Sequence, residues 1–81
     1  MFYTYIIYSE IADKYYVGQT SNVLERIKKH QNKNKGFTNQ AKDWKIVYQK
    51  PFDSRSQAMA HEKEIKSWKS RKMIIKLIDD N

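Results

Sequence analysis

The sequence has no cysteine, one proline, two glycines and no long apolar run. Without cysteine, neither a disulfide framework nor a Cys-built metal site can support the fold. A membrane-spanning helix needs about 18 consecutive apolar residues, and no such stretch occurs. Residues 1–8 are apolar but carry no basic region and no small-residue cleavage site, which favours a strand over a signal peptide. We therefore expect a cytoplasmic protein that is not associated with a membrane.

Acidic residues are also scarce relative to basic ones. Sixteen Lys and Arg against nine Asp and Glu give a formal net charge of +7, which favours a polyanionic partner such as nucleic acid or an acidic membrane surface. The charge alone leaves open a lysine-rich surface that is merely solvated. The 81 residues predict a single domain over 1–81, and 40% hydrophobic residues can build one small core.

Alternation of β-branched and aromatic residues predicts three strands, at 2–8, 14–19 and 44–50. The short polar connection between the first two predicts an antiparallel hairpin. In the third, the alternation predicts that Trp44, Ile46 and Tyr48 share one face, and Pro51 is expected to end the strand.

Three segments show helical spacing instead. Asn22 followed by Glu25 resembles a capping box and predicts a helix over 22–32. Apolar residues at three- and four-residue steps predict a second helix from near Ser54, and a short last helix around 73–78. The resulting order is β-β-α-β-α-α. This order predicts an α+β fold in which helices flank a small three-stranded antiparallel sheet.

The common metal and nucleotide motifs are missing. The sequence contains no CxxC, HExxH, P-loop or GxGxxG pattern. The two histidines, His30 and His61, lie on different predicted helices without a paired spacing, so a zinc site is not expected. Nothing in the sequence supports a serine-based triad.

Polar-tipped, cationic and titratable residues gather instead around the first hairpin and the first helix: Tyr3, Tyr5, Tyr16, Gly18, Arg26 and His30. A phosphodiester needs cationic donors, and arginine offers a planar fork for two oxygens. A divalent metal that offsets developing charge needs a carboxylate. Glu62 lies at the edge of the core-facing stripe of the second predicted helix, whereas Glu64 faces the opposite side.

Two short segments carry a family resemblance. Residues 3–5 (YTY) and 16–18 (YVG) resemble the paired motifs of the GIY-YIG nuclease superfamily, with ten residues between Tyr5 and Tyr16. Residues 18–30 (GQTSNVLERIKKH) and 35–48 (KGFTNQAKDWKIVY) resemble the segments that follow in short stand-alone members. These members are similar to the N-terminal nuclease domain of the bacterial excinuclease C subunit.

The resemblance implies a role for each matching residue. Tyr5 matches the usual candidate for the general base, and Tyr16 the tyrosine that helps to place the water and the phosphate. Arg26 matches the arginine that holds the scissile phosphate, and His30 a position that supports the base or the phosphate. Glu62 matches the ligand of a single divalent ion, Mg²⁺ or Mn²⁺. No small-molecule cofactor is implied.

The implied activity is metal-dependent endonucleolytic hydrolysis of phosphodiester bonds in nucleic acid, DNA in preference to RNA, in repair or recombination. The residues expected to contact nucleic acid are Gly18, Lys28, Lys29, Lys33, Lys35 and Lys42. Lysine–phosphate contacts would give affinity without sequence specificity. Whether the chain has a protein partner is left open by the sequence.

The chain departs from the family pattern at three points. Tyr3 stands where the first motif begins with glycine, and Val17 is the middle residue of the second motif. Many active members also carry an asparagine after the metal-ligand helix. No asparagine occurs between Lys63 and Asp79, so Ser70 or a lysine would have to replace it.

Two other functions remain open from the sequence. The chain could be a non-catalytic nucleic-acid-binding module with the same fold, or a protein-interaction domain whose charge is incidental. In either case the tyrosines would be ordinary half-buried strand residues with solvated hydroxyls, and Glu62 a solvated helix charge.

Overall fold

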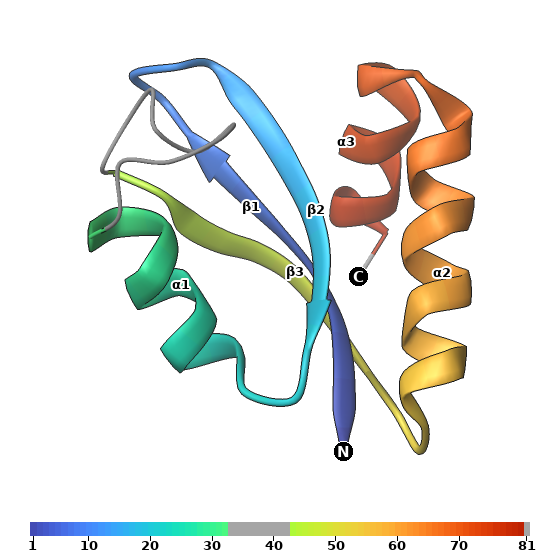
Figure 1. Cartoon of the computed structure of the whole chain (residues 1–81). Coiled ribbons are helices and arrows are strands. Elements are labelled where there is room, and N and C mark those ends of the chain that lie inside the picture. The colour runs from blue at the N-terminus through green and yellow to red at the C-terminus, as the bar shows by residue number, and fades with distance from the viewer. Residues whose placement is uncertain (33–42, 81) are drawn as a thin grey trace.

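Three antiparallel strands form a sheet with the order β2-β1-β3, so that β1 is central and the other two strands are edges (Figure 1). The computed structural model describes residues 1–32 and 43–80. The elements in chain order are β1 (Phe2–Ser9), β2 (Lys14–Thr20), α1 (Val23–Asn32), β3 (Lys45–Phe52), α2 (Arg55–Trp68) and α3 (Arg71–Asp79). The predicted α+β class and the order β-β-α-β-α-α are confirmed.

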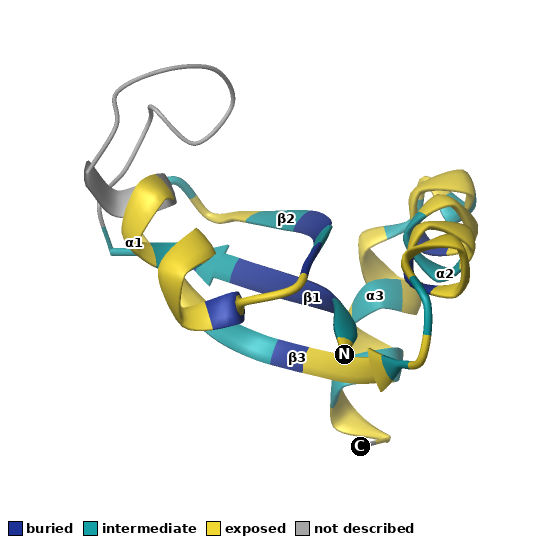
Figure 2. Cartoon of the chain, turned by 60° about the horizontal axis from the view of Figure 1, so that its bottom comes forward, coloured by how far each residue is buried: buried dark blue, intermediate teal, exposed yellow. Residues whose placement is uncertain are grey.

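The helices cover the two faces of the sheet unequally. Helix α1 lies on one face, and α2 and α3 lie together on the other (Figure 1). The core on the α1 face consists of Tyr5, Ile7, Val23 and Trp44. The core on the α2 face consists of Ile6, Val17, Tyr48 and Ile65. Successive residues of β1 thus serve opposite faces, as strand geometry requires, and the centre of β1 is buried from both sides (Figure 2).

A β-bulge in the pairing of β1 with β3 corrects one prediction. Ile6 pairs with Tyr48 but Ile7 pairs with Ile46, which leaves Val47 as an extra residue in β3. An extra residue reverses the alternation of faces beyond it. Ile46 accordingly packs on the α1 face with Trp44, whereas Tyr48 belongs to the opposite core. The prediction that these three residues share one face is wrong.

Pro51 does not end the third strand, which continues to Phe52. Proline lacks a backbone donor and is tolerated at sheet edges, and β3 is an edge strand. Here the strand extends beyond the expected boundary.

Serine caps define the starts of the last two helices. The Ser54 hydroxyl accepts a hydrogen bond from the Gln57 amide at 3.2 Å and begins α2. Lys69, in the left-handed region with φ 49°, ends α2, and Ser70 then caps α3 by accepting from the Met73 amide. The last helix therefore begins two residues earlier than the apolar spacing indicated. In the described part of the chain, no helix combines the length and apolar character needed to span a membrane.

Candidate active site

The paired strands β1 and β2 bring Tyr5 and Gly18 directly opposite one another. A Cβ atom on Gly18 would lie 2.5 Å from the Tyr5 hydroxyl and 2.7 Å from its Cζ. Real Cβ contacts are essentially never this short, so the Tyr5 ring occupies space that only glycine leaves open. Gly18 is buried by this ring. The structure thus gives Gly18 a packing role toward Tyr5, whereas a contact with nucleic acid stays a prediction.

Tyr5 is 2% exposed, and this burial raises the pKa of its hydroxyl far above the ordinary value. Tyr16 and the negative charge of Glu62 raise this pKa further, and the positive charge of Arg26 lowers it. Each of these three groups therefore lies close enough to act electrostatically on Tyr5. Tyr5 and these three sequence-predicted residues therefore lie in one neighbourhood. Because its pKa is raised, Tyr5 is a neutral phenol at neutral pH.

Arg26 is placed by the start of α1. The Asn22 side chain accepts from the Glu25 amide at 3.1 Å, and the Asn22 carbonyl accepts from the Arg26 amide at 3.1 Å. Val23 is buried against the α1 face of the sheet and anchors the first turn. The Arg26 side chain is exposed, and within the described residues it has no ion-pair partner. Its guanidinium is available to an anion.

Several sequence-predicted residues around α1 are placed only in part. His30 lies one turn after Arg26 in α1, but its side chain is outside the described part of the structure. Lys28 and Lys29 are exposed on the same helix. Lys33, Lys35 and Lys42 also lie outside the described residues. The basic path predicted from these lysines is therefore described only where it meets α1.

Glu62 comes from α2, in the layer opposite α1. Buried Ala58 and Ile65 seat α2 on the sheet, and the Thr4 hydroxyl donates to the Ala58 carbonyl at 2.7 Å. The Glu62 side chain is 19% exposed, and its Oε2 lies 2.7 Å from Nζ of Lys66 one turn later. The cluster is thus assembled from both layers, and Lys66 is a member that the sequence did not reveal.

The donor set around Glu62 fits one kind of metal ion. The residues that the structure describes hold no group of three or more His, Cys, Asp or Glu that could cage a metal. Magnesium commonly binds through one or two carboxylates and completes its shell with waters and substrate phosphates. Glu62, as a half-buried oxygen donor, fits that pattern if Lys66 releases it. A closed site for a soft metal does not fit.

Ser70 was one candidate to replace the asparagine that the family pattern carries. Its hydroxyl accepts the Met73 amide as the cap of α3, so it already has a structural role. Lys69 and Lys66 line an apolar groove against β2, beside Tyr16. Lys66 or Lys69 therefore lies where it could replace the missing asparagine. The Ser70 hydroxyl is already used as a helix cap.

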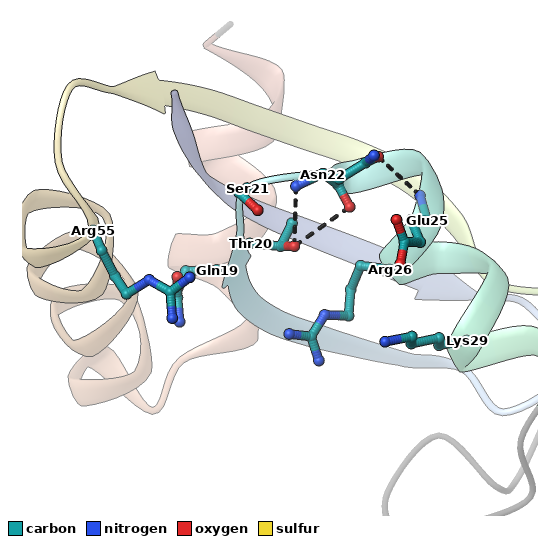
Figure 3. Close-up of a pocket in the computed structure, with 8 residues that line it drawn as sticks. All are labelled: Gln19, Thr20, Ser21, Asn22, Glu25, Arg26, Lys29 and Arg55. Atoms are coloured by element: carbon teal, nitrogen blue, oxygen red, sulfur yellow. Dashed lines mark hydrogen bonds between the residues drawn. The ribbon is translucent and has the colours of Figure 1, made fainter.

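A polar cavity next to Arg26 was not predicted from the sequence (Figure 3). It has a volume of about 190 Å³, and its lining comes from the end of β2, the start of α1 and the start of α2. The lining residues are Gln19, Thr20, Ser21, Asn22, Glu25, Arg26, Lys29 and Arg55. Arg55 reaches the cavity only because α2 begins near the end of β2, and no local sequence pattern indicates this.

The chain is similar to known proteins over most of its length. The family model described as the GIY-YIG catalytic domain matches residues 1–75. A UPF0213 protein of Staphylococcus haemolyticus is 39% identical over 80 residues, covering 96% of this chain and 94% of that protein. A UPF0213 protein of Staphylococcus saprophyticus is 36% identical over 66 residues, covering 80% and 79%. The solution structure of a UPF0213 protein from Bacillus halodurans matches with a TM-score of 0.61 at 32% identity, covering 98% of this chain and 84% of that one.

Proposed function

Because the chain belongs to the GIY-YIG catalytic-domain family, we propose that it is a metal-dependent endonuclease that hydrolyses phosphodiester bonds in nucleic acid, DNA in preference to RNA. The observation that carries the proposal is that Tyr16 packs against the core containing Tyr5, with Arg26 and Glu62 close enough to act on the Tyr5 hydroxyl. A buried phenol, an exposed guanidinium and a carboxylate are the groups that such a reaction uses to handle a proton, a phosphate and a metal.

Arg26 would hold the scissile phosphate. Its side chain is exposed, and no described carboxylate lies within ion-pairing distance. A planar guanidinium can donate to two phosphate oxygens at once, which fixes the orientation of the group as well as its position. Tyr16, half-buried on the same face as Tyr5, would help to orient the phosphate and the attacking water.

Tyr5 would take the proton of that water. Tyr5 can accept this proton only as the phenolate, so its own proton must first pass to solvent. The water oxygen then bonds to phosphorus as one water proton passes to the Tyr5 phenolate, the bond from phosphorus to the leaving sugar oxygen breaks, and that oxygen takes a proton from solvent. The phenolate form is disfavoured at neutral pH because burial raises the pKa of Tyr5. Arg26 favours the phenolate, and neutralising Glu62 removes a charge that opposes it.

Glu62 would hold the single divalent ion, Mg²⁺ or Mn²⁺. When bound, such an ion supplies positive charge that offsets the negative charge developing on the leaving oxygen. Lys66 occupies Oε2 of Glu62 at 2.7 Å and has to give up this contact. The half-buried carboxylate and its exposed counter-cation support this assignment.

A nicking assay on supercoiled plasmid with Mg²⁺ tests the proposal. We expect Tyr5→Phe, Arg26→Ala and Glu62→Ala each to lose roughly 100-fold or more in rate, the scale expected when a general base or a charge-stabilising group is removed. Lys63→Ala is the matched control, because Lys63 is exposed in α2 beside Glu62. It should stay near the wild-type rate.

Equal activity in wild type and all the variants would indicate a contaminating nuclease and overturn the proposal. Salt-sensitive DNA binding by the wild type without metal-dependent cutting would also contradict it. That result would indicate a binding module with the same fold.

A further inference from the structure

The polar cavity beside Arg26 has the charge of an anion site. Its lining includes three cationic side chains, Arg26, Lys29 and Arg55, against the single carboxylate of Glu25. All three cations are exposed, and none forms an ion pair with a residue that the structure describes. Like charges from separate elements raise one another's energy unless an anion lies between them. The cavity therefore favours a negatively charged ligand.

The cationic side chains converge from two elements. Figure 3 shows Arg26 and Lys29 extending from α1 and Arg55 from the start of α2, with the segment that ends β2 between them. The Arg55 guanidinium also stacks over the Phe2 ring, with its Cζ 5.1 Å from the ring centroid. A stacked guanidinium loses less conformational freedom when it binds a ligand. Arg55 is thus held in place to donate into the cavity.

The rest of the lining suits a hydrated phosphate. Ser21 and Asn22 contribute polar side chains, and the side-chain oxygen of Gln19 is buried without a hydrogen-bond partner among the described residues. A buried acceptor of this kind is usually satisfied by an ordered water. About 190 Å³ is several times the share of one water in the liquid, roughly 30 Å³. Space remains for a phosphate together with bridging waters.

The position of the cavity distinguishes it from the proposed cleavage site. Arg26 acts electrostatically on Tyr5, whereas Lys29 and Arg55 do not figure among the charges that do so. Arg26 thus lines the cavity and also acts on Tyr5, whereas Arg55 enters the cavity from the start of α2. One guanidinium has five donors and can contact two neighbouring phosphates.

We propose that this cavity, defined by Arg55, Lys29 and Arg26, binds the backbone phosphate adjacent to the scissile one on the same strand. The inference rests on the proposed endonuclease function and extends it from one phosphate to two. The contact would fix the register of the strand without reading its sequence. Arg55 is a binding residue here and takes no part in the chemical step.

DNA binding in EDTA, where no cutting can occur, tests the cavity directly. Fluorescence anisotropy with a labelled duplex oligonucleotide gives the slope of log K against log salt for each variant. Because Arg55→Gln removes one phosphate contact, the magnitude of its slope should be smaller than that of wild type by about 0.7–0.9. The ratio of wild-type to variant affinity should therefore change roughly threefold between 50 and 200 mM salt. Arg55→Lys should recover most of the slope because it keeps the charge.

Lys63→Gln is the matched control for the loss of one positive charge. Lys63 is exposed on the same helix and does not line the cavity. Its slope should stay at the wild-type value if Arg55 contacts a specific phosphate. Equal changes of slope in Arg55→Gln and Lys63→Gln would overturn the proposal, because the effect would then reflect net charge alone.

Cutting kinetics and neutral phosphates give an independent readout. Arg55→Gln should raise KM and leave kcat unchanged, since a remote phosphate binds equally in the ground and transition states. A methylphosphonate beside the cleaved bond should weaken binding to wild type but not to Arg55→Gln. If wild type cuts but neither difference appears, the cavity proposal fails alone. If wild type neither binds nor cuts nucleic acid, both proposals fail.

Discussion

At the scale of single residues, Tyr5 and Gly18 form one structural unit. The Tyr5 ring fills the space where any side chain at position 18 would project, and burial follows from that contact. The same burial raises the pKa of Tyr5, so packing and proton affinity have one cause. Tyr5 therefore stays protonated at neutral pH unless additional positive charge nearby lowers its pKa.

The raised pKa of Tyr5 predicts a specific loss of stability at alkaline pH. Unfolded chains release the tyrosine proton near pH 10, whereas folded Tyr5 keeps it to higher pH. Above pH 10 the unfolded state binds fewer protons than the folded state, so the free energy of unfolding falls with rising pH. The slope from one such group is about 1.4 kcal/mol per pH unit.

Denaturant unfolding between pH 8 and 11 measures this slope. Tyr5→Phe should lose the Tyr5 contribution, so the difference in stability between wild type and variant should shrink or reverse as pH rises above 10. Tyr15→Phe is the control, because Tyr15 is less buried than Tyr5 and is not among the groups that shift the pKa of Tyr5. A constant difference between wild type and Tyr5→Phe across this range would contradict the burial-driven shift.

Short motifs and their spacing singled out Tyr5, Tyr16, Gly18, Arg26 and Glu62 as candidates. In the fold, Gly18 packs against the Tyr5 ring, and Tyr16, Arg26 and Glu62 act electrostatically on Tyr5. The sequence could not predict Lys66 on Glu62 or Arg55 beside Arg26. The contact of Lys66 with Glu62 depends on the rotamers of two side chains at the helix surface. The position of Arg55 depends on how α2 is placed relative to the end of β2. The catalytic roles of Tyr5, Tyr16, Arg26, His30 and Glu62, and the nucleic-acid contact of Gly18, stay predictions.

At the scale of elements, alternation, apolar spacing and capping located each strand and helix that the structure describes, but their boundaries and faces depend on tertiary contacts. The bulge at Val47 reverses the faces of β3, and alternation cannot reveal an extra residue because both faces there are apolar. Pro51 was read as a stop, yet an edge strand tolerates a missing donor. Ser70 began the last helix earlier than its apolar residues did.

Asp43 links two elements through a contact that no sequence pattern indicates. Its carboxylate accepts the Glu10 and Ile11 amides at 3.0 and 3.1 Å and the Ser9 hydroxyl. These groups belong to the end of β1 and the turn that leads to β2. The Ser9 hydrogen bond, together with the backbone amides, lowers the pKa of Asp43 below its ordinary value. One side chain just before β3 thus organises the first hairpin.

We expect Asp43→Ala to reduce hydrogen-exchange protection of the Glu10 and Ile11 amides about tenfold or more, because each loses a charged acceptor. Asp53→Ala, which removes an exposed carboxylate elsewhere, should leave both amides unchanged. The lowered pKa means that this stabilisation is present above the ordinary carboxyl pKa and is lost as pH falls through the Asp43 pKa. Unchanged protection in Asp43→Ala at neutral pH would show that the turn holds without the carboxylate.

At the scale of the whole molecule, charge and architecture divide the work of recognition. A net charge of +7 on 81 residues attracts any polyanion, but attraction does not determine where the strand lies. In the proposed function the two layers would determine the position of the strand. Helix α1 supplies Arg26 and Lys29, α2 supplies Arg55 and Glu62, and the sheet supplies the tyrosines. The bound strand would therefore contact residues from both layers.

Binding of nucleic acid should raise the melting temperature strongly, since a ligand at 100 times its Kd stabilises the folded state by about 2.7 kcal/mol. For a domain of 60–100 residues each kcal/mol corresponds to roughly 4–8 °C, so we expect a shift on the order of 10–20 °C with duplex DNA in EDTA. Raising the salt from 50 to 200 mM should remove much of this shift, because phosphate contacts release counterions. Differential scanning fluorimetry measures it, with polylysine as the control of opposite charge. A shift that is absent, insensitive to salt or equal with polylysine would indicate a protein-interaction domain whose positive charge is incidental.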